Sequence, residues 1–471
     1  IENIFPYVAY KWVQTGETDS LLDQNAAFDT LRQDTDQQLI RQLTANLQNA
    51  QRSALVTSTP QPGLAEQILQ EQSDYLAEKK AGMTQAELEQ LVADTLAFDE
   101  WNALQMQNED LSIPVADLPL EEPLPQVTQR QEEGITYLTV PSGMEGIGSY
   151  AVYFDTSTIP QEDLYYLRLY LLLADQLGTK THTATEMNQL AMQYLYGYTL
   201  GTKYPDSGAF ANPFVYLQWY ALPQDTEASL DLLLELFGQL DLNPEEVLYA
   251  IDQILPQSDL SRTDEMDLAI LLAQTVSGSS YQYAEMLSGQ GFYEFLAQQR
   301  AQLDADPAAM DTLTAKLQEI SGHILHRDNL VVMAAAPADT LDGFCALAGE
   351  KLGALPSLPK AQAAYAFPQY PDQFAVATEG STTTTAAVLD AKKLENLSGT
   401  LFPFLYALEN QYLVPTIRFQ GLAYSAGILV SSQLDQLSVY SYSDPNPAAS
   451  VAAIAQIPDV LAELELTQEE L

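Results

Sequence analysis

The chain has 471 residues, is 46% hydrophobic, and carries 64 acidic against 19 basic residues, which gives a formal net charge of −45. This apolar content predicts a globular protein, and the length predicts several domains, each large enough for a core of its own. The negative charge argues against nucleic acid as a partner, because nucleic-acid binding requires basic patches, and it argues equally against anionic membrane surfaces.

Residues 1–123 are predicted to be mainly helical. The first 58 residues are expected to form helices that close with a strand at 53–59. Residues 63–101 are expected to form a helical hairpin, with Gly82 just after its first helix. Thr84 and Glu87 have the spacing of a capping box, which predicts the start of the second helix.

Residues 124–360 predict a sheet combined with several helices. Four strands are expected, at 136–140, 150–154, 214–220 and 330–334. One long helix is expected from Ile159 to Thr179, and Asn243 followed by Pro244 is typical of another helix start. Strands followed by runs of helices predict an α+β fold, in which helices cover one face of a largely antiparallel sheet.

Residues 361–471 predict the beginning of a second copy of this plan. A strand at 374–378, a leucine-rich helix at 394–410, strands at 428–432 and 437–442, and a helix after Ser443 are expected. Thr467 and Glu470 form a further capping box, which opens a helix where the sequence stops. We therefore expect the chain to be an internal fragment of a longer protein.

An arginine and a tyrosine, Arg418 and Tyr424, flank a predicted turn that contains Gly421. This R-x-x-G-x-A-Y pattern resembles an element in the C-terminal half of the pitrilysin/insulinase-type zinc peptidases, the inverzincins, and most of all their presequence-protease branch. The helical hairpin, the segment from Ile113 to Pro119 and the helix start after Ser443 follow in the order of that family. The resemblance therefore covers essentially the whole chain.

The resemblance implies a domain organisation of repeated pitrilysin-like domains with α+β folds. Residues 1–60 would be the end of the second domain, and residues 61–123 a helical-hairpin linker. Residues 124–360 would be the third domain, and residues 361–471 a truncated fourth domain.

The resemblance also implies roles for the residues of the turn. In the family, the arginine and tyrosine reach across a closed chamber to a peptide held on a zinc site elsewhere. Tyr424 would act as the catalytic O–H donor to the oxyanion, a contact typically worth about 3 kcal/mol. Arg418 would hold substrate carbonyls, and Gly421 would let the backbone pass close to the peptide. The family usually has Gly-Gly-Ala-Tyr-Gly, whereas this chain has Leu422 and Ser425 in place of two of the glycines.

The zinc-binding sequence of that family, H-x-x-E-H, is not found in this chain. The three histidines are His182, His323 and His326; the last two have helical spacing, but a helix end is the favoured interpretation. We expect no metal ligands and no cofactor in this chain, with zinc in the N-terminal domain of the parent enzyme. The single cysteine, Cys345, is expected to be a small core residue and not a nucleophile.

Two functions from different classes stay open. In the first, the chain is the non-catalytic C-terminal portion of a zinc metalloendopeptidase that degrades short unfolded peptides in a closed chamber, and it is inactive alone. In the second, it is a catalytically inactive homologue that acts as a scaffold or peptide-binding subunit. The expected partners are peptides, including basic ones attracted by the negative charge, and the N-terminal catalytic half, with no nucleic acid and no membrane. The expected compartment is a bacterial-like cytoplasm, with an organellar matrix or secretion as alternatives.

Overall fold

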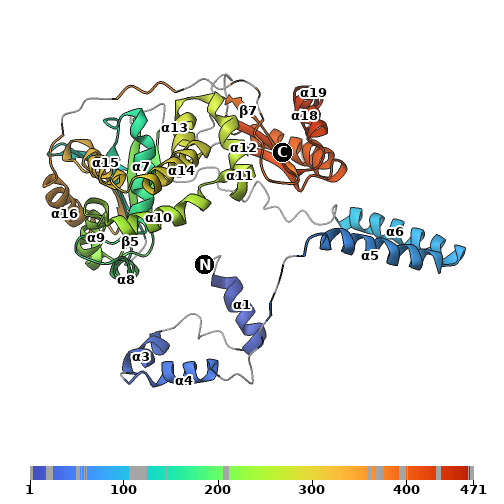
Figure 1. Ribbon diagram of the computed structural model, residues 1–471, viewed down its shortest axis with the longest axis horizontal. Helices are drawn as coiled ribbons and strands as arrows, with labels where there is room; N and C mark the ends of the chain where they lie inside the picture. The colour runs from blue at the N-terminus through green and yellow to red at the C-terminus, as the bar shows by residue number, and fades with distance from the viewer. Residues whose placement is uncertain are drawn as a thin grey trace. The chain divides into compact units, whose positions relative to one another are not determined.

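The structure is a computed structural model that describes residues 4–16, 25–34, 36–48, 54, 56–57, 59, 61–105, 125–143, 146–204, 212–358, 363–367, 371, 373, 375–391, 399, 401–430, 436–464 and 466. The chain separates into two compact units, Ile1–Leu120 and Glu121–Leu471 (Figure 1). The capping box predicted at Thr467 and Glu470 lies outside the described residues.

The first unit is helical wherever it has regular structure among its described residues. Its helices are α1 (Ile4–Thr15), α3 (Asn25–Gln33), α4 (Gln38–Leu47), α5 (Leu64–Ala81) and α6 (Gln85–Gln105). The two helices predicted at 63–101 are confirmed, as is the capping box between them. The Glu87 carboxylate accepts a hydrogen bond from the Thr84 N–H at 2.7 Å, and the Glu87 N–H donates to Thr84 Oγ1 at 3.3 Å. These bonds to Thr84 lower the pKa of Glu87.

The strand predicted at 53–59 is wrong at its described positions. Ala54, Val56, Thr57 and Thr59 have no regular secondary structure, and Val56 is 88% exposed. A strand needs a neighbouring strand to pair its backbone groups, and the described residues of this unit form none.

The second unit contains a six-stranded sheet with the order β1-β2-β6-β3-β5-β4. Its strands are β1 (Thr128–Glu132), β2 (Ile135–Pro141), β3 (Gly148–Asp155), β4 (Tyr198–Lys203), β5 (Phe214–Ala221) and β6 (Leu330–Ala336). Neighbouring strands are antiparallel, except that β2 and β6 are parallel. The four predicted strands are confirmed. The edge strands β1 and β4 were not predicted, because the residues of β1 are largely exposed, those of β4 are mostly half-buried, and neither strand has the regular alternation of a buried strand.

Helices cover one face of this sheet. The helices of this region are α7 (Leu164–Ala174), α8 (Ala184–Tyr194), α9 (Thr226–Gly238), α10 (Pro244–Gln257), α11 (Leu260–Thr263), α12 (Glu265–Gln274), α13 (Ser279–Ser288), α14 (Gln290–Ala305), α15 (Ala309–Ile324) and α16 (Leu341–Gly353). Short 3₁₀ turns lie at η3 (Gln161–Asp163), η4 (Pro223–Asp225), η5 (Thr275–Ser277) and η6 (Arg327–Asn329). Burial alternates along β2, β5 and β6, and the buried residues join the helices in one large core. This alternation is what a sheet with helices on one face produces.

Two predicted helix features of this region have different outcomes. Asn243 caps α10, because its side chain accepts a hydrogen bond from the Glu245 N–H at 3.0 Å and Pro244 follows it, as predicted. The helix predicted from Ile159 to Thr179 is shorter in the structure. It begins with the 3₁₀ turn η3, and α7 ends at Ala174.

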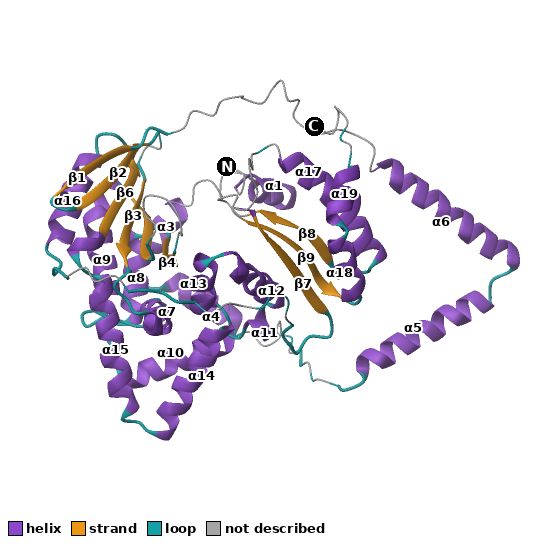
Figure 2. Cartoon of the chain, turned by 90° about the horizontal axis from the view of Figure 1, so that it is seen from above, coloured by secondary structure: helices purple, strands orange, loops and turns teal. Residues whose placement is uncertain are grey.

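A second, three-stranded sheet has the antiparallel order β7-β9-β8. It is built from β7 (Thr383–Asp390), β8 (Ser425–Val430) and β9 (Gln436–Asp444), with α17 (Leu401–Leu408), the π-helix η8 (Glu409–Gln420), α18 (Pro447–Ala455) and α19 (Ile457–Glu463) (Figure 2). Its strand order repeats that of β3, β5 and β4 in the first sheet. The protein thus has an α+β fold in which one plan occurs twice.

Two predictions in this region are corrected. The strand predicted at 374–378 is wrong, since its described residues 375–378 form no strand and β7 lies at 383–390 instead. Seven residues of β7 pair with β9, and residues 375–378 have no such partner strand. The helix predicted at 394–410 is described from residue 401, and helical structure continues through 420. Residues 394–398 and 400 lie outside the described part.

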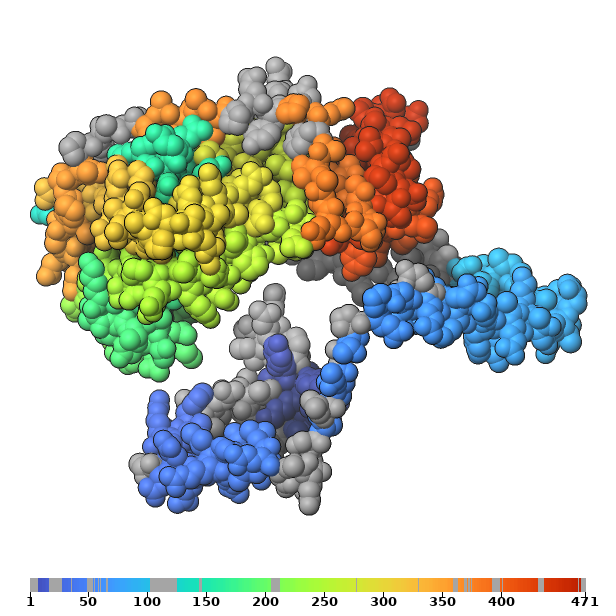
Figure 3. Space-filling model, in the orientation of Figure 1, coloured from blue at the N-terminus to red at the C-terminus, as the bar shows by residue number. Residues whose placement is uncertain are grey.

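The helix α12 links the second sheet to the helices of the first, because it also packs against α13, which contacts α7. Helix α12 contacts β7 and β9, and Gln436 Nε2 donates to the Gln274 carbonyl at 3.5 Å. Figure 3 shows the surface of the C-terminal residues, in orange and red, meeting that of the preceding helices. Arg262 and Glu379 form an ion pair of 2.8 Å across the same region. The domain boundaries at 60, 123 and 360 stay predictions.

In the part of the chain that the structure describes, no helix is both long enough and apolar enough to cross a membrane.

Candidate functional site

The turn that carries Arg418 and Tyr424 emerges from the π-helix η8. This helix follows α17 directly and contains Pro415, which has no N–H and so interrupts the α-helical bonding pattern. The Gly421 N–H donates to the Thr416 carbonyl at 3.0 Å, the five-residue spacing of a π-helix. Segments of this kind are frequent at functional sites.

The backbone of the turn is held at every residue from 421 to 424. The hydrogen bonds run from Leu422 N–H to Arg418 O at 3.0 Å, from Ala423 N–H to Ile417 O at 3.2 Å, and from Tyr424 N–H to Tyr442 O at 3.0 Å. In addition, Asn446 Nδ2 donates to the Gly421 carbonyl at 2.8 Å. The turn is therefore tied both to the helix before it and to β9.

The side chains of Arg418 and Tyr424 are exposed although the backbone of the turn is fixed. Tyr424 is 71% exposed, and its ring meets the ring of Tyr442 edge-on with centroids 6.0 Å apart. Arg418 is exposed, and its guanidinium lies over the ring of Phe419 at 5.5 Å. Among the described residues, neither the Tyr424 hydroxyl nor the Arg418 guanidinium has a hydrogen-bonding partner. Both groups are thus available to a ligand.

Glycine is required at position 421 because a backbone atom of the preceding helix lies very close to it, and not because its backbone angle is unusual. Its φ is −82°, but a Cβ at this position would lie 2.5 Å from the Ile417 carbonyl oxygen. That oxygen belongs to the backbone and cannot move without shifting the helix end. The predicted passage of substrate close to Gly421 stays a prediction.

Supporting residues that were not predicted from the sequence lie at the end of β9 and just after it. Asp444 is buried and accepts hydrogen bonds from Ser441 Oγ at 2.9 Å and from the Asn446 N–H at 2.7 Å. Asn446 in turn holds the Gly421 carbonyl. From the sequence, this segment was interpreted only as a helix start, although Asp and Asn in a Pro-containing turn are typical donors and acceptors for backbone groups. On the other side, Glu409 Oε2 accepts the Ile428 N–H of β8 at 2.8 Å.

Gly421→Ala is expected to lower the free energy of unfolding by about 1–3 kcal/mol, the usual cost of overpacking against atoms that cannot move away. Urea denaturation of the chain measures this change. Gly343→Ala in α16 is the matched control, because nothing lies within 4 Å of its added Cβ, and it is expected to be neutral or stabilising. Equal stability of Gly421→Ala and the wild type would contradict the packing described here.

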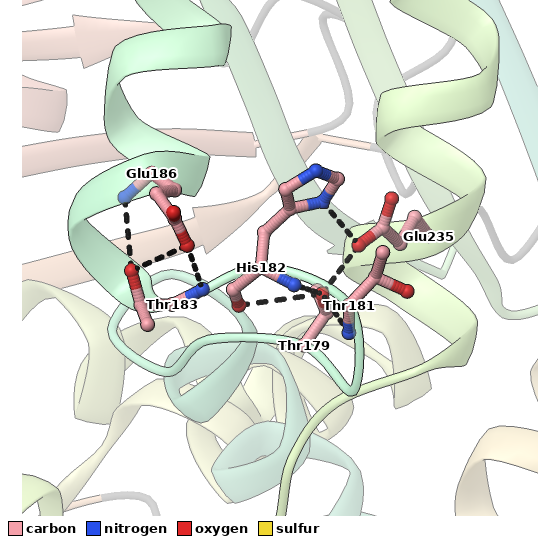
Figure 4. Close-up of polar contacts among 6 residues, drawn as sticks. All are labelled: Thr179, Thr181, His182, Thr183, Glu186 and Glu235. Carbon is pink, nitrogen blue, oxygen red and sulfur yellow. Dashed lines mark hydrogen bonds and ion pairs between the residues drawn. The ribbon is translucent and has the colours of Figure 1, made fainter.

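His182 lies in a loop that is closed by polar contacts, as Figure 4 shows. Its Nδ1 is 2.9 Å from Glu235 Oε1, and its N–H donates to Thr179 Oγ1 at 2.9 Å. The Thr179 hydroxyl also donates to the Glu235 carboxylate. These contacts give His182 a structural role in joining the loop after α7 to α9.

The other two histidines and the cysteine are also accounted for by packing. His323 Nδ1 is 3.1 Å from Thr158 Oγ1, and His326 is buried. Cys345 is buried, and burial raises the pKa of its thiol, which disfavours the thiolate needed for nucleophilic chemistry. Within the described residues, no three His, Cys, Asp or Glu side chains gather closely enough to hold a metal ion. These residues do not fit a zinc centre, so no step of a reaction is assigned to a metal bound by this chain.

The purified 471-residue chain is expected to hold no stoichiometric zinc, because its histidines and cysteine do not form the closed ligand set of a zinc site. Elemental analysis after dialysis measures the bound metal. One tightly held zinc ion per chain that disappears on His323→Ala or His326→Ala would contradict this prediction.

A sequence model of the peptidase-associated family of subfamily C of the M16 peptidases matches residues 59–298, just over half of the chain. The chain belongs to this family and is a C-terminal, peptidase-associated part of a pitrilysin-like protein. Its relatives include Protein HypA of Clostridium perfringens (strain 13 / Type A), which is 21% identical over 439 residues, 90% of this chain and 44% of that protein. The chain thus spans less than half the length of this curated relative. The family match ends before Arg418, so the roles of the turn residues stay predictions.

Two solved structures share the fold. A protease from Helicobacter pylori has a TM-score of 0.50 and 16% identity, with 74% of this chain and 82% of that chain covered. A conserved protein from Enterococcus faecalis V583 has a TM-score of 0.51 and 14% identity, with 73% and 82% covered. At such low identity, the likeness shows the fold alone.

Proposed function

We propose that this chain is the non-catalytic C-terminal portion of a zinc metalloendopeptidase that degrades short unfolded peptides in a closed chamber. In this proposal the chain supplies part of the chamber wall and the contacts to the substrate and the oxyanion. One observation carries the proposal: the turn at 418–424 has a fully anchored backbone and presents a guanidinium and a phenol that have no partner among the described residues. Membership in the peptidase-associated family supports it.

The chemistry of the turn suits stabilisation of charge that develops during peptide hydrolysis. A phenolic O–H such as that of Tyr424 donates to an oxyanion, and a donor held in place before the reaction needs no reorganisation when the charge appears. The planar guanidinium of Arg418 can donate two parallel hydrogen bonds to substrate carbonyls. The bonds to Tyr442 and Asn446 keep the backbone of the turn from moving. The zinc of the parent enzyme would polarise the scissile carbonyl from the N-terminal catalytic domain.

The face of the six-stranded sheet opposite to the helices is consistent with a chamber wall. Tyr153 of β3 lies opposite Tyr216 of β5, and their rings stack with centroids 5.9 Å apart. Phe214 meets Tyr153 edge-on at 5.2 Å. These half-buried aromatic rings lie on the face opposite to the helices, where they would offer apolar and hydrogen-bonding contacts to an extended peptide.

The alternative function, a catalytically inactive scaffold or peptide-binding subunit, is favoured by one observation. Leu422 and Ser425 replace two glycines of the pattern that the family usually has. The residues encoded before Ile1 distinguish the two functions, because only a peptidase requires an H-x-x-E-H sequence there.

Peptide hydrolysis tests the proposal directly. A quenched fluorogenic peptide is offered to the whole protein, to the 471-residue chain alone, and to this chain recombined with the preceding half. We expect cleavage by the whole protein and by the recombined halves, and none by the chain alone. A whole protein that binds the peptide without cleaving it would establish the scaffold function instead.

A further inference from the structure

Leu422 has an unusual backbone conformation in the middle of the turn. Its φ is +66°, in the left-handed region that side chains with a Cβ rarely adopt. Among the described non-glycine residues, the others with positive φ are Gln37, Glu133 and Ser443, all of which are polar. Glycine would take this conformation without steric conflict. A leucine therefore occupies a position where the backbone favours glycine.

The Leu422 side chain does not stabilise the fold in return. It is 70% exposed, whereas the next residue, Ala423, is buried in the core of the second sheet. A strained residue that adds no packing indicates a functional constraint. The strain lies two residues before Tyr424 and four after Arg418, between the two side chains proposed to contact the peptide.

We infer that Leu422 is a specificity-determining residue, which contacts a large apolar side chain of the bound peptide, such as leucine or phenylalanine. The inference rests on the proposed function of the turn. Phe419 and Tyr424, which are 63% and 71% exposed, lie three residues before and two residues after Leu422 and offer further apolar surface on the same turn. When Arg418 holds a backbone carbonyl of the peptide, the adjacent peptide side chain lies beside this surface. The occupant is apolar because a leucine side chain offers contact area but no hydrogen bond.

The test uses pairs of peptides. The two peptides of a pair are identical except that one has leucine and the other alanine at a single position, and this position differs from pair to pair. The whole protein is expected to prefer the leucine peptide about tenfold in kcat/KM at one position, the usual scale for a few buried methylene groups. Leu422→Gly removes the side chain and relieves the backbone, and Leu422→Asn keeps a residue that tolerates the left-handed region. Both variants are expected to lose the preference, so that their kcat/KM values for the leucine and the alanine peptide lie within about twofold of each other.

The control is Leu389→Ala, because Leu389 is an exposed leucine on β7, outside the turn, and this variant should keep the preference. If the whole protein binds without cleaving, the same tenfold preference is expected in the Kd values measured by fluorescence anisotropy. A preference that persists in Leu422→Gly, or an equal loss for both peptides, overturns the role of Leu422. Wild-type behaviour of Arg418→Ala and Tyr424→Phe overturns the proposed function instead, and the role of Leu422 with it.

Discussion

Tyr424→Phe in the whole peptidase is expected to lower kcat about a hundredfold while KM stays within about twofold of the wild-type value. The substitution removes only the phenolic oxygen and keeps the ring that packs against Tyr442. An oxyanion exists in the transition state and not in the bound substrate, so the lost hydrogen bond affects turnover and leaves ground-state affinity intact. Steady-state kinetics on one fluorogenic peptide measure both constants.

Tyr406→Phe is the matched control for this experiment. Tyr406 lies on α17 and is 73% exposed, much like Tyr424, but it lies outside the turn. Loss of the Tyr406 hydroxyl is expected to leave kcat and KM unchanged. A Tyr424→Phe enzyme that turns over at the wild-type rate would show that Tyr424 serves only to pack against Tyr442.

Arg418→Ala is expected to raise KM and to lower kcat/KM by roughly ten- to a hundredfold, because hydrogen bonds from a charged group are each worth about 1.5–3 kcal/mol. A guanidinium that holds substrate carbonyls acts on the ground state and the transition state alike, so its loss raises KM and leaves kcat nearly unchanged. Arg418→Lys is not expected to restore activity, since a lysine lacks the planar fork and the stacking on Phe419.

Arg262→Ala provides the control for loss of an arginine. Arg262 is an exposed residue of α11 that pairs with Glu379 at 2.8 Å, and an exposed ion pair contributes about 0–1 kcal/mol to stability. Its kinetics are expected to match the wild type. Full activity in Arg418→Lys would mean that positive charge alone is sufficient at position 418, and the geometric role of the guanidinium would then be wrong.

Local signals in the sequence were enough to predict many elements of the fold. The capping box at Thr84 and Glu87 and the Asn243–Pro244 helix start depend on contacts within one helical turn, so they occur wherever the helix does. Strands β2, β5 and β6 alternate between buried and half-buried residues because one face of their sheet is covered. The R-x-x-G-x-A-Y pattern likewise marked a turn that the structure contains.

Elements that depend on a partner could not be predicted in this way. The segments at 53–59 and 374–378 have strand-like sequences but no neighbouring strand at their described residues, whereas the exposed edge strand β1 exists because β2 pairs with it. The π-helix before the turn also depends on its surroundings, since Tyr412 Oη donates to the Ala453 carbonyl of α18 at 3.0 Å. Pairing and packing across long sequence separations decide these elements.

In the candidate site, too, some features could be predicted from the sequence and others depend on tertiary contacts. The sequence alone was enough to select the residues proposed to carry its chemistry, because Arg418, Gly421 and Tyr424 lie within seven consecutive positions. Only the tertiary structure decided how they are held. Asn446, which follows β9, donates a hydrogen bond to the Gly421 carbonyl. Leu422 takes a left-handed backbone conformation that a leucine in the sequence does not predict. Sequence specifies the groups that can react or bind, whereas their geometry depends on hydrogen bonds from segments that only folding brings together.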